Sequence, residues 1–140
     1  MSIIADILTD MKTAIDGAGL GITADIEYNT LVDIKDLADT KVTLIPQSDS
    51  RELFTRRAST RDITVNINIQ KKLPVDYDND DIDEILELVE DIADIIQPAA
   101  MAVSGAAWIS TLNDPIYSQE ELGPSRLITS VLAVVYKTGT

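Results

Sequence analysis

The segment from Ile63 to Gln70 limits the possible folds more than any other part of the chain. Its residues alternate between apolar and polar, with Ile63, Val65, Ile67 and Ile69 separated by Thr64, Asn66, Asn68 and Gln70. A period of two is typical of a strand with one face against a core and the other toward water or a partner. The chain therefore contains a sheet that needs a cover on one side.

Two amphipathic helices are predicted to provide this cover. Residues 3–16 carry apolar side chains at the spacing of three and four that places them on one helix face. A second apolar stripe runs through the acid-rich segment from Asp81 to Ile96, which should end before Pro98. Asp81 and Glu84 have the spacing of a capping box at its start.

The remaining pattern completes an α+β fold. Pro46 should stop an early strand, with a polar loop from Gln47 to about Thr60, and a short helical turn is expected at residues 32–38. The last strand is apolar on both faces, which is typical of a central strand. We predict one domain over residues 1–140, with two amphipathic helices packed on one face of a mostly antiparallel sheet. Its further strands are expected at residues 22–29, 41–45, 107–112 and 126–138.

The composition argues against an enzyme. The chain has no cysteine and no histidine, so thiolate nucleophiles, imidazole proton shuttles and the commonest zinc ligands are excluded. Ten acids and no base lie between Asp76 and Asp94, and a small carboxylate-dependent hydrolase stays an alternative on that basis. Most of these carboxylates fall opposite the apolar stripe, where they are solvated. We therefore expect no catalytic residues and no cofactor.

The charge balance limits the partners. Asp and Glu outnumber Lys and Arg by 24 to 11, and the formal charge of −13 opposes binding to nucleic acid or to an anionic membrane. Any contact with DNA must be local. No apolar run approaches the roughly 20 residues that span a bilayer, and the first residues lack a basic signal-peptide region. We expect a protein that is made in a cytoplasm and does not enter a membrane.

One stretch resembles a calcium loop. Asp76, Asp78, Asp80 and Glu87 occupy its first, third, fifth and twelfth positions, but the sixth is Asp81 where the loop needs glycine. No helix is predicted before it. A charged helix start explains the acids better, because carboxylates suit the positive end of a helix dipole. We expect no metal, with a calcium-binding module as the alternative.

The clearest candidates for a binding role are interface residues. The segment around Phe54 holds four of the five arginines, Arg51, Arg56, Arg57 and Arg61. An apolar anchor surrounded by arginine is typical of an interface, although a mobile solvated loop explains it equally well. An acidic helix of an adjacent copy, through Glu87, Glu90 and Asp94, is one surface on which it could dock. The uncharged side chains of Asn66 and Asn68 could meet another surface without burying charge.

The whole chain resembles the tail-terminator, or tail-completion, proteins of tailed bacteriophages. The resemblance rests on the order of features: an N-terminal amphipathic helix, the sequence Lys41 to Pro46, an arginine-bearing loop, the strand Asp62 to Lys71, the acidic helix Asp80 to Ile96, Trp108, the stretch Pro115 to Leu122, and a last strand ending Val134 to Lys137. These features cover nearly all 140 residues. They are patterns of order and spacing without a catalytic signature.

The resemblance implies a structural virion protein. Such a protein forms a homo-oligomeric ring, usually a hexamer, that stops polymerisation of the tail tube and joins the tail to the head at the neck. Its expected partners are the tail-tube protein and a head-tail connector protein, with DNA nearby in the channel. Another neck or connector protein, or a tail-tube protein, is the alternative, since fold alone does not assign the role.

Overall fold

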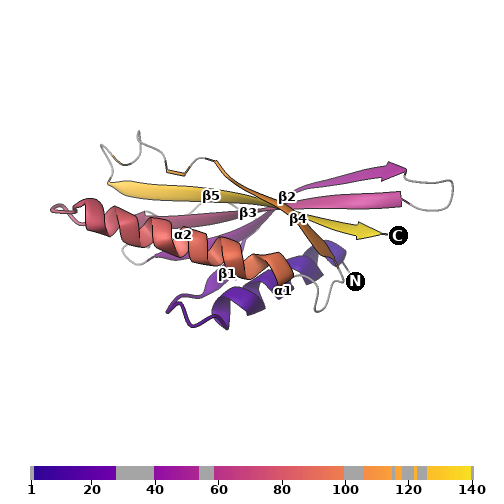
Figure 1. The fold of residues 1–140 in the computed structure, drawn as a ribbon, viewed down its shortest axis with the longest axis horizontal. Coiled ribbons are helices and arrows are strands. Elements are labelled where there is room, and N and C mark those ends of the chain that lie inside the picture. The colour runs from indigo at the N-terminus through magenta and orange to yellow at the C-terminus, as the bar shows by residue number, and fades with distance from the viewer. Residues whose placement is uncertain are drawn as a thin grey trace.

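The computed structural model describes residues 2–27, 40–53, 59–99, 106–114, 116–117, 122 and 126–139. The predicted helical turn at residues 32–38 lies outside them. The described elements follow each other in the order drawn in Figure 1. They are α1 (Ile3–Asp16), β1 (Ala24–Ile26), β2 (Lys41–Leu53), β3 (Ser59–Lys72), α2 (Asn79–Ala99), β4 (Ala107–Asn113) and β5 (Leu127–Gly139).

The five strands form one sheet in the order β1-β2-β3-β5-β4. The β1–β2 pair is parallel and the other three pairs are antiparallel. The prediction of an α+β fold with a mostly antiparallel sheet is confirmed. β5 lies between β3 and β4, as its two apolar faces predicted. The register of β3 on β5 is continuous from Thr60 opposite Gly139 to Lys72 opposite Leu127.

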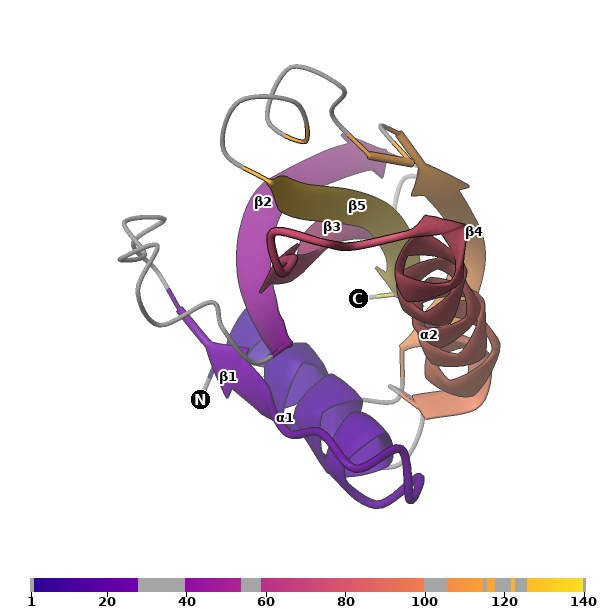
Figure 2. The same cartoon turned by 90° about the vertical axis from the view of Figure 1, so that its left-hand side faces the viewer.

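Both helices pack on the same side of this sheet. Figure 2 shows the sheet curving around α1 and α2, with α1 beside β1 and β2 and α2 beside β4 and β5. The buried side chains of β3 are the odd-numbered ones, as predicted from the alternation. The core joins both helices to the sheet through side chains that are almost completely buried, including Ile7, Met11, Ile15, Leu44, Ile67, Ile92, Ile96, Leu132 and Tyr136.

The two helix starts are capped by side chains. The Ser2 hydroxyl accepts a hydrogen bond from the Ala5 amide at 3.3 Å. At α2 the cap is Asp78, whose Oδ1 accepts from the Asp80 and Asp81 amides at 3.1 and 3.2 Å. Asp81 Oδ2 in turn accepts from the Asp78 amide at 3.1 Å, which completes a capping box.

The prediction of a capping box at Asp81 and Glu84 is therefore wrong by one turn. Acids recur at a spacing of three in this segment, so the spacing alone could not select the first pair. The expected end before Pro98 is also wrong, because α2 continues to Ala99. Proline lacks one backbone donor, and a helix can carry that loss in its last turn.

The largest difference from the sequence prediction is in β2. Pro46 was expected to stop the strand, yet β2 continues through it to Leu53 and β3 begins at Ser59. The parallel partner β1 pairs with residues 42–44 only, so Pro46 lies where one edge of β2 has no neighbour among the described strands. A bulge follows between Pro46 and Ser48. Proline is tolerated at such edges and bulges because no ladder bond needs its missing N–H.

Charged side chains attach the end of α1 to β1. Lys12 Nζ donates to Asp16 Oδ2 at 2.7 Å and to the Ala24 carbonyl at 2.6 Å. Asp16 Oδ1 accepts from the Ala24 amide at 2.7 Å. The hydrogen bond from Lys12, and then that from Ala24, lower the pKa of the Asp16 carboxyl. The turn between the two elements uses Gly19 and Gly21 at φ 75° and 76°, which other residues rarely adopt.

Candidate functional site

The middle of the sheet face opposite the helices is uncharged over four strands, whereas Lys41, Asp62 and Lys137 lie toward the ends of the same face. The register places Ile45, Asn66, Ala133 and Leu112 in one row across β2, β3, β5 and β4. Neighbouring rows contain Thr43, Asn68 and Val131, and Thr64, Val135 and Ser110. We call these positions the uncharged sheet face. It contains both asparagines that the sequence selected as candidate contacts.

The middle of this face is half-buried, and part of its geometry is fixed by hydrogen bonds. Asn66 Nδ2 donates to Gln47 Oε1 at 3.0 Å, so the bulge of β2 orients the asparagine. Thr43 is 2% exposed, and its buried hydroxyl has no hydrogen-bond partner among the residues that the structure describes. Leu112, at the β4 margin, is 61% exposed. Sequence reasoning missed Gln47 because it placed that residue in a loop.

The far end of the β2–β3 hairpin carries an ion-pair cluster. Arg61 donates to Asp49 through Nε at 3.3 Å and through Nη2 at 2.6 Å. Arg51 Nη2 donates to the same carboxylate at 3.2 Å. The hydrogen bond from Arg61, and then that from Arg51, lower the pKa of the Asp49 carboxyl to about 2. The hydrogen bond to Asp49 in turn raises the pKa of Arg61.

Within this cluster, only one of the two arginines is well placed to meet a partner. The Arg51 side chain is 63% exposed, whereas that of Arg61 is 16% exposed and holds Asp49 from two nitrogens. Phe54, Arg56 and Arg57 lie outside the described residues. Asp49 was missed by sequence reasoning, because its approach to Arg61 depends on a hairpin register that the sequence did not predict.

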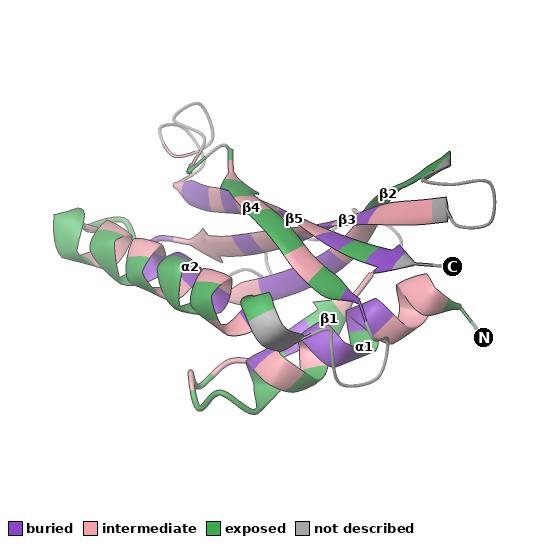
Figure 3. Cartoon of the chain, turned by 45° about the vertical axis from the view of Figure 1, so that its right-hand side comes forward, coloured by how far each residue is buried: buried purple, intermediate pink, exposed green. Residues whose placement is uncertain are grey.

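The exposed side of α2 is acidic. Glu87, Glu90 and Asp94 are exposed, and no Lys or Arg occurs between Asn79 and Ala99. Figure 3 shows exposed and buried positions alternating along α2, with the buried ones turned toward the sheet. The acidic side of α2 and the arginine-bearing end of the β2–β3 hairpin therefore lie on different parts of the molecule. Figure 1 places the hairpin end and the start of α2 at opposite ends.

The acids that resemble a calcium loop have other roles in this fold. Asp78 caps α2 through its Oδ1, while Glu87 is exposed further along the same helix. Among the described residues, no three His, Cys, Asp or Glu side chains lie close enough together to hold a metal ion. No helix in the described parts of the chain is long and apolar enough to cross a membrane.

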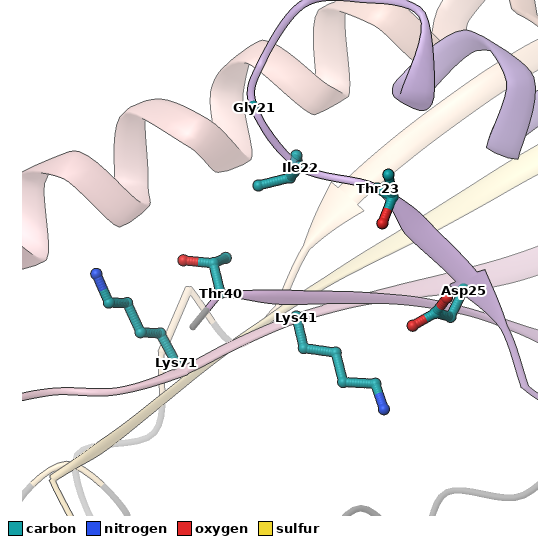
Figure 4. A pocket seen from close by; sticks show the side chains of 7 residues that line it. All are labelled: Gly21, Ile22, Thr23, Asp25, Thr40, Lys41 and Lys71. Atoms are coloured by element: carbon teal, nitrogen blue, oxygen red, sulfur yellow. The ribbon is translucent and has the colours of Figure 1, made fainter. Parts of the chain in front are cut away.

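A polar hollow of about 620 Å³ opens between the start of β2 and the turn before β1. It is lined by Gly21, Ile22, Thr23, Asp25, Thr40, Lys41 and Lys71. Figure 4 shows the ammonium groups of Lys41 and Lys71 extending away from each other, so they do not converge on one point.

Comparisons with solved structures show a distant likeness in fold. No protein-family model matches the chain, and no curated protein matches it. A solved structure of the sheath/tube terminator of an extracellular contractile injection system, PVC, in the extended state, aligns with a TM-score of 0.45 and 14% identity. The alignment covers 96% of this chain and 56% of that one, so this chain spans about half the length of its neighbour. A likeness this distant does not assign a role.

Proposed function

We propose that this chain is a structural protein that assembles with copies of itself into a ring, and that the ring ends a tail tube. The observation that carries the proposal is the uncharged sheet face, which extends over four strands of a chain whose net charge is −13. The resemblance of the sequence to bacteriophage tail terminators supports the role in a tail. No part of the proposal needs a catalytic group or a cofactor.

Charge restricts the surfaces through which copies can meet. Acidic surfaces of like chains repel each other, and burying an unpaired carboxylate costs about several kcal/mol. The uncharged sheet face avoids both penalties, because its amide, hydroxyl and aliphatic side chains include no ionised group. Asn66 and Asn68 lie in adjacent rows of this face and are its proposed central contacts.

A second contact would pair opposite charges. In a ring each subunit meets its neighbours through two different patches. The hairpin end and the acidic side of α2 are complementary in sign and separate in space. We place Arg51, with Phe54, Arg56 and Arg57, against Glu87, Glu90 and Asp94 of the next copy. Arg61 would act behind them, where it holds Asp49. Exposed ion pairs contribute about 0.2 to 1 kcal/mol each, so they set register more than affinity.

By the same resemblance, the ring would be a hexamer in the neck of a tailed-phage virion. It would contact the tail-tube protein on one side and a head-tail connector protein on the other. The arginines at the hairpin end would then pass near the DNA in the channel, although the net charge of the chain otherwise repels DNA.

The proposal is tested by the size of the purified particle. We expect light scattering and electron microscopy to show a ring for the parent chain, and smaller species for the double variant Asn66→Lys/Asn68→Glu. The matched control is Thr13→Lys/Ala18→Glu, which introduces the same charges at exposed positions on and beside α1. A monomeric parent, or a sheet-face variant that assembles as the control does, would refute the proposal. The purified protein is then added to growing tail tubes. A terminator stops their growth, whereas a tube protein extends them.

A further inference from the structure

The two margins of the sheet differ in how well they are protected. Among the described strands, β4 pairs with β5 alone, so its other edge presents backbone donors and acceptors without a neighbouring strand. Ala107–Asn113 contains no charged residue and no proline. Natural proteins usually block such an edge with charge, proline or a covering segment, because another strand can pair with it.

On the other side of the sheet, the part of β2 that extends beyond β1 has these protections. Beyond the three residues that pair with β1, β2 carries Pro46 and a bulge. Three charged residues follow, at Asp49, Arg51 and Glu52. The same chain thus protects one edge of its sheet and leaves the edge of β4 suited to pairing.

Exposed apolar side chains gather at the unprotected edge. Ile109, Leu112 and Ile116 are 46%, 61% and 53% exposed. The bulge between Trp108 and Ser110 includes Ile109, and bulges commonly redirect a side chain. The end of the strand is anchored to β5, because Asn113 Nδ2 donates to the Ser130 hydroxyl and to the Val131 carbonyl, both at 2.9 Å. The edge therefore combines a fixed backbone with apolar side chains that nothing in the described part of the chain covers.

The surrounding charge is negative. α2 packs against β4, and its exposed acids include Glu90 and Asp94. The basic residue of β5 that lies beside β4 is Lys137, which pairs with Ala107 at the start of β4. If two copies paired through β4, their acidic α2 helices would approach each other. A segment of another protein with basic side chains meets no such repulsion.

We propose that the free edge of β4 binds an extended segment of a different protein by strand addition. Main-chain hydrogen bonds would join the segment to Ser110–Leu112, its apolar side chains would cover Ile109 and Leu112, and its lysines or arginines would face the acids of α2. This surface shares Ser110, Leu112 and the acids of α2 with the contacts proposed for the ring, but the peptide binding that tests it does not require a ring to form.

The first test uses a fluorescein-labelled heptapeptide of alternating valine and threonine with a lysine at each end. We expect saturable binding to the full chain by fluorescence anisotropy at low salt. Methylation of every peptide nitrogen should weaken binding at least about tenfold, because it removes the strand donors. Replacing both lysines with glutamate should weaken it by a similar factor. No binding, or equal binding of the methylated or acidic peptide, would overturn the proposal.

The second test locates the site. Leu112→Lys should weaken binding of the lysine peptide at least about tenfold, since it adds a like charge and removes an apolar contact. Val75→Lys is the matched control, because Val75 is 82% exposed and lies before α2, away from β4. An equal loss of peptide affinity in Leu112→Lys and Val75→Lys would contradict the assignment of the site to β4. Sedimentation of the concentrated protein completes the test, and a dimer that Leu112→Lys abolishes would show a second copy on β4 instead.

Discussion

At the scale of single residues, Tyr136 links three elements. Its hydroxyl donates to the Ile96 carbonyl at 2.5 Å, which ties β5 to the last turn of α2. The last four carbonyls of a helix lack partners within the helix. Burial, and then the negative charge of Asp10 on α1, raise the pKa of the Tyr136 hydroxyl. The tyrosine therefore remains a neutral donor throughout the ordinary pH range.

We predict that Tyr136→Phe destabilises the fold by about 1 to 3 kcal/mol, because it removes this donor and leaves a buried carbonyl without it. Urea denaturation measures the change. Tyr77→Phe serves as the comparison, since Tyr77 is half-buried at the edge of the core. Equal stability of Tyr136→Phe and the parent would mean that water replaces the hydroxyl.

A second prediction at this scale concerns the pH response of the hairpin. Asp49 has its pKa lowered from 3.8 to about 2, so its ion pairs stabilise the hairpin above about pH 4. That contribution is lost as the pH falls from about 4 to about 2. NMR titration of the Asp49 carboxyl carbon should show the low midpoint, and Arg61→Gln should return it toward 3.8. A midpoint near 3.8 in the parent would show that the cluster does not form in solution.

At the scale of elements, local patterns were predictable and register was not. The stripes of α1 and α2 and the alternation of β3 depend on neighbours in sequence, so their positions follow from periodicity. The extension of β2 depends on pairing with β3, which overrides the local signals of Pro46 and the polar residues after it. For the same reason Arg61 and Asn66 were selected as candidates, while Asp49 and Gln47, to which they donate across the hairpin, were not.

The start of α2 gives a test that separates the two possible capping boxes. Asp78→Ala should cost about 1 kcal/mol, because it removes the acceptor for the Asp80 and Asp81 amides. Glu84→Ala should change the free energy of unfolding by less than about 0.5 kcal/mol, as at other surface positions. Thermal or urea unfolding of both variants measures this difference. A larger loss in Glu84→Ala would place the cap one turn later.

At the scale of the whole molecule, the many carboxylates in and before α2 do not require a bound metal ion for the chain to fold. Those of α2 are exposed to solvent or, at Asp78 and Asp81, bonded to backbone amides. We predict that chelator and excess calcium leave the melting temperature and the particle size unchanged. A calcium-dependent rise of about 4 °C or more, which corresponds to about 1 kcal/mol in a domain of this size, would contradict the prediction.

The central position of β5 has a consequence for the time course of folding. β5 is the last of the described strands to be synthesised, yet it joins β3 to β4 and its register reaches back to Thr60. Until it emerges from the ribosome, one edge of β3 is open and β4 has no partner in the sheet. Contacts between residues so distant in sequence form slowly, and unpaired strands attract other chains meanwhile. Nascent chains are therefore most vulnerable to aggregation between the emergence of β3 and that of β5, and a chaperone that holds β3 would act in that interval.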